Sequence, residues 1–142
     1  MLEAFGATPE RSVIIINNEL PIGKAANAAA VVAFTLGQRH PALVGEKFQD
    51  GTGTSYPGVI FTGISILGAS PGELIAISEK ASAAANCDVV VFPLEGQTTV
   101  DYEEFRRVMA DVMPERLGYL AIGLAGHRKS INKIVGNLKL LR

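Results

Sequence analysis

A lysine follows a glycine at the start of an alanine-rich segment, in the stretch ELPIGKAANAAA (residues 19–30). An apolar run precedes it, so Gly23 and Lys24 lie where a strand is expected to lead into a helix. The helix dipole disfavours a cation in the first turn and draws anions to the same place. A charged residue that opposes the helix dipole at such a strand-to-helix junction is a functional candidate. We therefore expect Gly23 and Lys24 to face a small anionic ligand; the alternative is that the lysine only extends into water.

The Gly-Lys pair does not belong to a phosphate-binding P-loop. That motif requires a glycine five residues before the pair and a serine or threonine after the lysine. This chain has Asn18 and Ala25 at the two positions. Nucleotide binding of the P-loop type is therefore excluded.

A second polar cluster follows the apolar run CDVVVFPL and consists of Glu95, Gly96, Gln97, Thr98 and Thr99. Thr98 fits a helix N-cap, with Asp101 three residues later reaching back, although capping and ligand contact can coexist. Glu95 can act as a general base if a hydrophobic pocket raises its pKa. The cluster is thus either a ligand-binding loop with catalytic potential or a helix start.

The remaining reactive residues indicate no metal, cofactor or nucleophile triad. His40 and His127 have no partner at metal-ligand spacing, and no G-x-S-x-G motif is present. Cys87 is the single cysteine, which excludes an internal disulfide, and it precedes a buried run, as a structural thiol does. The loop DGTGTS (50–55) can wrap a phosphate or sugar, or can be a flexible connector.

The composition is that of one soluble globular domain over residues 1–142. Hydrophobic residues make up 48% and charged residues 19% of the chain, and the net charge of −1 gives no overall field that attracts nucleic acid. From Arg116 on there are six basic residues and no acidic one, which indicates either a modest basic tail or a solvated surface. Neither a leader nor an apolar run near 18 residues occurs, so we expect a cytoplasmic protein without membrane contact.

Apolar runs bounded by turn residues alternate with amphipathic segments. The run SVIIINN is rich in β-branched residues and predicts a strand buried on both faces. Ser70, Pro71 and Glu73 combine an N-cap, a proline at the first helical position and a capping box. In full, we expect strands at 12–18, 59–67, 87–94 and 119–124, and helices at 21–38, from 70 to about 84, at 101–113 and at 130–135.

This alternation predicts an α/β fold in which helices cover a largely parallel sheet. Residues 1–11 are expected to form a loose lead-in, and residues 41–58 a loop insertion. In such sheets ligands bind beyond the carboxyl ends of the strands. Lys24 follows the first strand and the 95–99 cluster follows the third, so both candidate sites are expected at this edge.

Three stretches resemble, in their order, the peptidyl-tRNA hydrolase II family: VIIINNELPIGKAANAAA, EGQTT and the closing YLAIGLAGHRKSINKIVGNLKLL. The resemblance covers most of the chain from Ser12 on, apart from 41–58 and the helix at 101–113. A bacterial family of unknown function on the same fold is closer still. The resemblance implies a three-layer α/β/α sandwich on a mixed four-stranded sheet, with the fourth strand antiparallel, and a homodimer.

Enzymes of that family hydrolyse the ester between a peptide and the 3′ end of tRNA, and carry a lysine, an aspartate and a threonine at the site. The resemblance places the lysine at Lys24, the threonine at Thr98 and a loop glycine at Gly96. The aspartate position holds Leu94 instead, with Glu95 beside it, so the group expected to activate water is lost. A second lysine and a histidine of the family fall on Ala26 and Ala33.

Three functions follow as alternatives. The first is a non-hydrolytic protein that binds a small anion at a degenerate site of Gly23, Lys24 and residues 96–99. The second is an active hydrolase in which Glu95 replaces the aspartate and Lys24 and Thr98 complete the catalytic set. The third is a dimeric interaction module without a ligand. Binding of tRNA has weak support, because it depends on many basic contacts and the chain is slightly acidic.

Overall fold

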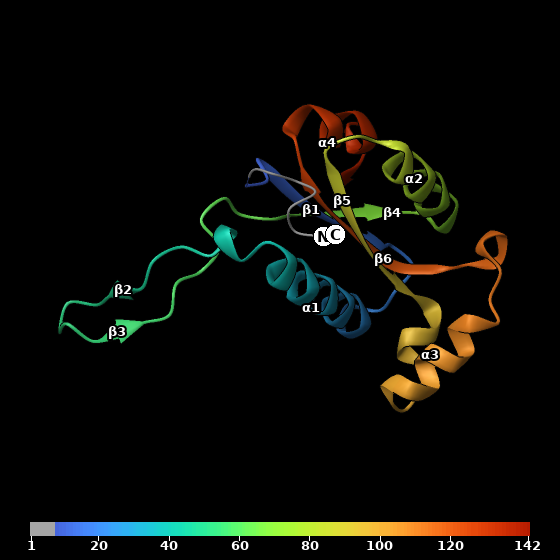
Figure 1. The fold of residues 1–142 in the computed structure, drawn as a ribbon, viewed down its shortest axis with the longest axis horizontal. Coiled ribbons are helices and arrows are strands. Elements are labelled where there is room, and N and C mark those ends of the chain that lie inside the picture. Colours follow the sequence, from blue (N-terminus) through green and yellow to red (C-terminus); the bar gives the residue numbers. More distant parts are fainter. Residues whose placement is uncertain (1–7) are drawn as a thin grey trace.

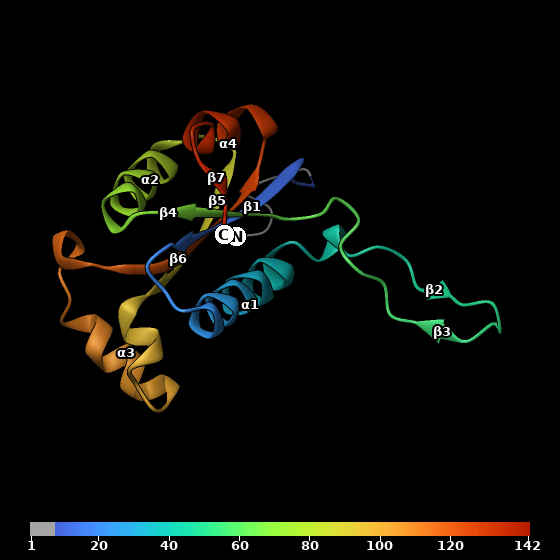
Figure 2. The same ribbon diagram turned by 180° about the vertical axis from the view of Figure 1, so that it is seen from behind.

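In the computed structural model of this chain, which describes residues 8–142, a five-stranded mixed sheet carries helices on both faces (Figures 1 and 2). The strand order is β5-β6-β1-β4-β7. The strands are β1 (Arg11–Asn17), β4 (Ser65–Ala69), β5 (Cys87–Pro93), β6 (Tyr119–Gly126) and β7 (Lys139–Leu140). The predicted α/β class is confirmed. Most of the predicted lead-in at 1–11 lies outside the described residues.

The central strand β1 is buried on both faces, as its β-branched run predicts. Val13 and Ile15 face one core, which α2 (Pro71–Ala83) and α4 (Arg128–Val135) cover. Ile14 and Ile16 face a second core under α1 (Ile22–Arg39). All four side chains are at most 1% exposed. Alternate residues of one strand therefore hold the two helical layers onto the sheet.

The strand directions bring three carboxyl ends to one edge of the sheet. β1 runs parallel to β4, and both β1 and β5 run antiparallel to β6. β1, β4 and β5 therefore share one direction. The segment into α1 and the 3-10 helix η3 (Leu94–Gln97) consequently leave the sheet at the same edge.

The predicted four-stranded sheet is wrong in number. The fifth strand, β7, pairs antiparallel with β4 through Leu67–Leu140 and Gly68–Lys139. Two residues are too short for a periodic pattern, so the sequence gives no strand signal there. The strand expected at 59–67 forms only at Ser65–Ala69, where β1 provides a partner.

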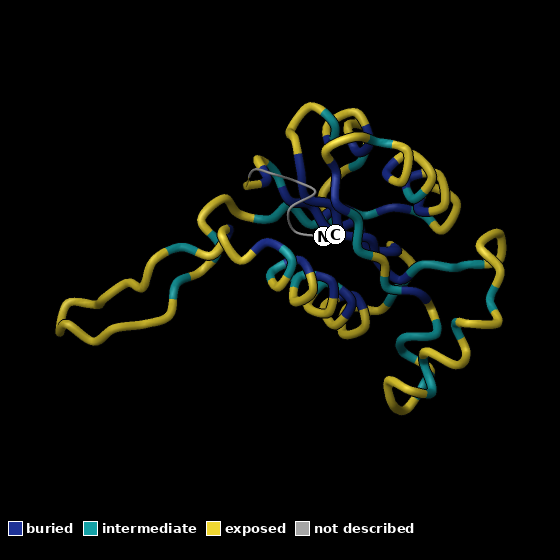
Figure 3. The backbone as a smooth tube through the Cα atoms, in the orientation of Figure 1, coloured by how far each residue is buried: buried dark blue, intermediate teal, exposed yellow. Residues whose placement is uncertain are grey.

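The predicted loop at 41–58 contains regular structure. It begins with a 3-10 helix at Pro41–Leu43 and continues into an arm, residues 44–62, with strands β2 (Phe48–Gln49) and β3 (Ser55–Tyr56). The arm projects from one end of the molecule and is exposed along most of its length (Figures 1 and 3).

The arm is ordered by its own contacts rather than by the core. The rings of Phe48 and Tyr56 stack with centroids 5.4 Å apart. At the tip, Asp50 accepts hydrogen bonds from the Thr52 hydroxyl at 2.6 Å, the Tyr56 hydroxyl at 2.7 Å and the N–H groups of Thr52 and Thr54. These bonds, that from the Thr52 side chain first, hold the pKa of the Asp50 carboxyl well below its usual range.

A buried charged cluster joins the end of α1 to the edge strand β5. Asp88, 4% exposed, accepts two hydrogen bonds from Arg39 at 2.6 and 2.8 Å and one from His40 at 2.7 Å. Burial raises the pKa of Asp88, but these hydrogen bonds and charges outweigh it and leave the pKa below its ordinary value. The neighbouring Cys87 is 8% exposed, and burial raises the pKa of its thiol to about 11, as befits a structural thiol.

Candidate functional site

Lys24 lies in the first turn of α1 and is exposed. The helix begins at Ile22 after Pro21, which supplies no capping side chain, and the first turn contains no acidic residue. The first backbone hydrogen bond of the helix runs from Ala25 to Pro21. The N–H groups of the first turn and the Lys24 ammonium therefore share one positively polarised surface.

The other three α-helices of the described chain begin differently. Ser70 and Glu73 form a complete capping box on α2, as the sequence predicts. Asp101 caps α3 (Tyr102–Ala110) by accepting from the Glu104 N–H at 2.8 Å. At α4, the Glu10 carboxylate accepts from the Arg128 N–H at 2.9 Å. Among residues 8–142, only α1 starts without a side-chain acceptor on its first N–H groups.

Gln97 connects the two predicted parts of the site. Its side-chain nitrogen lies 3.1 Å from the main-chain oxygen of Lys24 and 3.4 Å from Oδ1 of Asn27. η3 is therefore fixed against the first turns of α1. The structure thus brings together Lys24 and the 95–99 cluster, which are more than seventy residues apart in the sequence.

Two asparagines that the sequence analysis did not single out shape this corner. Asn17, 7% exposed, accepts from the Glu19 N–H at 2.9 Å and donates to the Tyr119 carbonyl oxygen at 3.3 Å. It thereby fixes the turn that leads from β1 into α1. Asn27 lies one helical turn beyond Lys24, and its position as a polar residue within an alanine run is the signal that identifies it.

Glu95 neither pairs with Lys24 nor points freely into solvent. Its Oε1 atom is buried and has no hydrogen-bond partner among the described residues. Its main-chain oxygen accepts from the hydroxyls of Thr98 at 3.3 Å and Thr99 at 2.9 Å. A buried carboxylate oxygen without a partner is costly, so Glu95 is a candidate acceptor for a ligand group.

The expected N-cap role of Thr98 is wrong. Asp101 is the N-cap of α3, and Thr98 closes the preceding 3-10 turn through its N–H to the Glu95 carbonyl oxygen. The aspartate competes successfully because its carboxylate reaches the N–H three residues on. Thr98 remains exposed at the rim of the corner.

Gly96 has a packing role in η3. A Cβ atom there would lie 2.0 Å from Cε1 of Phe92, so only glycine lets the loop lie on this ring. At Gly23 a Cβ would meet nothing within 4 Å. The open space above Gly23 leaves the helix start accessible.

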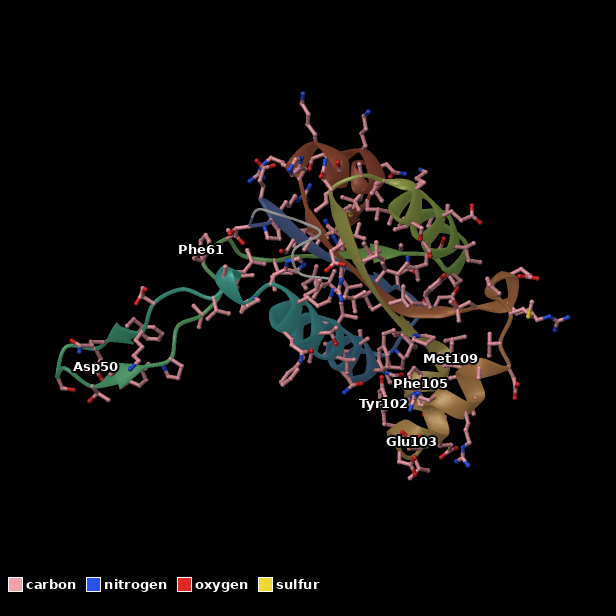
Figure 4. All side chains as sticks on the ribbon, viewed as in Figure 1. Asp50, Phe61, Tyr102, Glu103, Phe105 and Met109 are labelled. Carbon is pink, nitrogen blue, oxygen red and sulfur yellow. The ribbon has the colours of Figure 1, made fainter. Side chains whose placement is uncertain are left out.

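A groove of about 450 Å³ continues from the corner between α1 and α3. Its polar end has Asn27, Gly96 and Thr99, and its apolar part includes Val31, Tyr102 and Phe105. Figure 4 shows Tyr102 and Phe105 on α3, and the groove places them opposite α1. The groove thus lies beside the start of α1, but neither Gly23 nor Lys24 lines it, and the Asp101 carboxylate does.

The other candidates lie elsewhere. The DGTGTS loop forms the tip of the arm, where Figure 4 labels Asp50, at the opposite end of the molecule from α3. His127 precedes α4, on the other face of the sheet. Within residues 8–142, no three His, Cys, Asp or Glu side chains are grouped as a metal site. None of the described helices has the length and apolar character needed to span a bilayer.

Fold and site together define an α/β protein with a polar corner at the carboxyl edge of its sheet. Residues 10–142 match the family described as "Protein of unknown function (DUF2000)", and the chain belongs to this family. This agrees with the expected closeness to a family of unknown function.

A solved structure with a similar fold is that of the protein of unknown function Atu0240 from Agrobacterium tumefaciens str. C58. The two superpose with a TM-score of 0.84 and 19% sequence identity, over 92% of this chain and 96% of that chain. At this identity the likeness shows the fold alone. No curated protein matches the chain.

Proposed function

We propose that this protein binds a small anionic ligand at the start of α1, without ordinary hydrolase activity. The observation that carries the proposal is the helix start itself, which has no capping side chain and has Lys24 in its first turn. Backbone N–H groups at a helix start and an ammonium group are the donors that phosphates and carboxylates bind. Gln97 donates a hydrogen bond to the Lys24 carbonyl oxygen and so holds η3 beside the helix start.

The shape of the site favours a ligand with an apolar part next to its anionic group. The groove begins at Asn27, one turn from Lys24, and continues past Val31 and Tyr102. A ligand whose phosphate or carboxylate contacts Lys24 can place an apolar body there. The partnerless Oε1 of Glu95 offers an acceptor for a hydroxyl or amino group of the same ligand.

At the level of the fold, we propose a peptidyl-tRNA hydrolase II-like arrangement with an altered site. In support, the fourth predicted strand, β6, lies antiparallel between β1 and β5, as the resemblance implies. The site is altered because Leu94 stands where the resemblance places the aspartate. The Leu94 side chain is 46% exposed and lies close to Gly118. Leucine cannot activate water.

The test is a thermal-shift titration of the wild type and two variants with inorganic phosphate and with phosphate and carboxylate esters of apolar alcohols. A ligand at 100 times its Kd adds about 2.7 kcal/mol, which raises the Tm by several degrees. We expect Lys24→Ala to abolish the shift. Lys129→Ala is the matched control, because Lys129 is also exposed in the first turn of a helix, on α4.

Equal loss of the shift in both variants would contradict a specific site, as would a wild type that no ligand of the panel stabilises. Stabilisation by tRNA alone would also contradict the small-anion proposal.

The buried Oε1 of Glu95 favours a second candidate, an ester hydrolase in which Glu95 activates water. This candidate predicts saturable turnover of peptidyl-tRNA by the wild type. It also predicts that Glu95→Gln abolishes turnover without lowering the Tm. Turnover that is lost in both Lys24→Ala and Glu95→Gln would replace the binding proposal by the enzyme.

A further inference from the structure

A polar pocket of about 310 Å³ lies at the amino end of β1, remote from the corner that holds Lys24. Its walls come from the start of β1, from the segment that enters β4 and from the start of α4. The corner lies beyond Asn17, about 17 Å further along the strand. A ligand of this pocket therefore does not contact the proposed anion site. Six polar residues line the amino-end pocket: Glu10, Arg11, Ser12, Thr62, Ser65 and Arg128.

The pocket exists because β1 begins before β4 does. Their pairing starts at Val13 and Ser65, whereas β1 starts at Arg11, where β6 already pairs with it. Gly63 has a φ of +75°, in the left-handed region that favours glycine, and it turns the chain just before β4. On the β4 side, Arg11 and Ser12 therefore have no neighbouring strand within residues 8–142, and this gap is the pocket.

The Ser12 hydroxyl is the first sign that the pocket holds a ligand. Ser12 is 5% exposed, and its Oγ atom is buried with no hydrogen-bond partner in the described part of the chain. A buried hydroxyl without a partner destabilises the fold, because it has lost its hydrogen bonds to water. An alanine at this position would avoid that cost. The serine is therefore better explained by a ligand group that binds to it than by packing.

Two arginines bring positive charge that no carboxylate side chain of the described residues pairs with. The Arg11 guanidinium donates to Oδ1 of Asn132, and the Arg128 guanidinium donates to the main-chain oxygen of Glu10 at 3.3 Å. Neither arginine takes part in the ion pairs found within residues 8–142. A guanidinium fits a carboxylate through two parallel hydrogen bonds. The pocket is thus prepared for the anionic group of a ligand.

Glu10 gives the same pocket a negative side. Its Oε1 atom accepts from the main-chain N–H of Arg128 at 2.9 Å, which leaves Oε2 as an acceptor. An ammonium group has only donors and is a good partner for such an oxygen. The charges of the pocket are therefore complementary to a ligand that has both an anionic and a cationic group.

We propose that the amino-end pocket binds a free α-amino acid with a short polar side chain. The ligand carboxylate contacts the two guanidinium groups and the Ser12 hydroxyl, and the ligand ammonium contacts Glu10. The ligand side chain meets the hydroxyls of Thr62 and Ser65. The volume of about 310 Å³ lies at the lower end of the roughly 300–1,000 Å³ of small-molecule sites, which fits one amino acid rather than a peptide.

Inorganic phosphate is a poor ligand for this pocket. It has no positive group to pair with Glu10, and the carboxylate repels it. A phosphate titration of the Lys24 site and an amino-acid titration of this pocket therefore report on different sites.

The first test is an NMR titration of the isotope-labelled full chain with L-serine. Saturable shifts are expected at the backbone N–H signals of Ser12, Gly63 and Arg128, and none at Gly23 and Lys24. Two analogues each lack one charged group: 3-hydroxypropanoate has no ammonium group, and 2-aminoethanol has no carboxylate. Each should bind at least about tenfold more weakly, because a charge-assisted contact is lost. No shift with L-serine, shifts confined to Gly23 and Lys24, or equal affinity for an analogue would overturn the proposal.

The second test uses two variants with different expected signatures. Arg128→Ala should raise the Kd for L-serine at least about tenfold. Arg116→Ala is the matched control, because Arg116 is an exposed arginine that does not line the pocket, and it should leave the Kd unchanged. Ser12→Ala should raise the Kd roughly fivefold while the urea midpoint stays equal or rises, because the variant removes an unpaired buried hydroxyl. A lower midpoint with an unchanged Kd would show a purely structural hydroxyl and overturn the proposal, as would an Arg128→Ala variant that binds like the wild type.

Discussion

Replacement of Asp88 by asparagine tests how firmly α1 is joined to the edge of the sheet. The carboxylate is 4% exposed and binds Arg39 through both oxygens, with His40 on one of them. In Asp88→Asn one oxygen becomes an NH₂ group, which cannot accept the Arg39 hydrogen bond. The Arg39 side chain, only 25% exposed, loses the counter-charge of its guanidinium.

The expected cost follows from this burial. Removal of one partner from a buried ion pair costs about 3–5 kcal/mol. Arg39 retains partial access to water, so we expect about 3 kcal/mol, which corresponds to a Tm lower by roughly 10 °C for a chain of this size. The measurement is urea unfolding followed by circular dichroism at pH 7. Asp111→Asn is the control, because Asp111 is exposed and should change the free energy of unfolding by less than about 0.5 kcal/mol.

The pH dependence gives a second readout. The pKa of Asp88 is lowered in the folded protein. Its ionised carboxylate therefore contributes to the free energy of unfolding above the unfolded-state pKa of about 3.9, and this contribution is lost as pH falls through the lower folded-state pKa. The difference in stability between wild type and Asp88→Asn should therefore narrow below about pH 4. A difference below about 1 kcal/mol at pH 7, or one that grows in acid, would refute this reasoning.

Three further changes test local features. Gly96→Ala should lower stability by about 1–3 kcal/mol, because the new Cβ meets the Phe92 ring; urea unfolding measures this, and an unchanged midpoint would contradict it. Gly23→Ala should stabilise by up to about 1 kcal/mol, because space is free and alanine favours helix; a lower Tm would show a constraint at this corner that the geometry lacks. Asp50→Ala should speed hydrogen exchange at the Thr52 N–H without changing the Tm, and equal exchange in both proteins would argue against the tip network.

Much of the fold can be predicted because its signals are local. The Val/Ile run of β1 is apolar at every position, and the strand is buried on both faces. Ser70, Pro71 and Glu73 fix a helix start within one turn, where the capping box is found. Each of these signals depends on neighbouring residues alone, so it can be read without the fold.

The features that could not be predicted depend on distant partners. β7 exists because β4 offers a free edge, and the arm owes its pairing to the Asp50 network. The spacing predicts Thr98 as the cap, whereas in the fold Thr98 ends the 3-10 turn and Asp101 caps α3. Gln97 belongs to the predicted site, but its contact with Lys24 is visible only in three dimensions.

The central claim is that anions bind at the start of α1, and an NMR titration of the isotope-labelled protein with inorganic phosphate tests it most directly. The account predicts saturable shifts of the backbone N–H signals of Gly23 and Lys24 and of the Gln97 side-chain NH₂, lost in Lys24→Ala. Lys129 also lies in the first turn of a helix, but at that helix, α4, the Glu10 carboxylate already accepts from the first N–H group. The backbone N–H signal of Lys129 should therefore not shift. Equal shifts at both lysines, or none at Gly23 and Lys24, would contradict the claim.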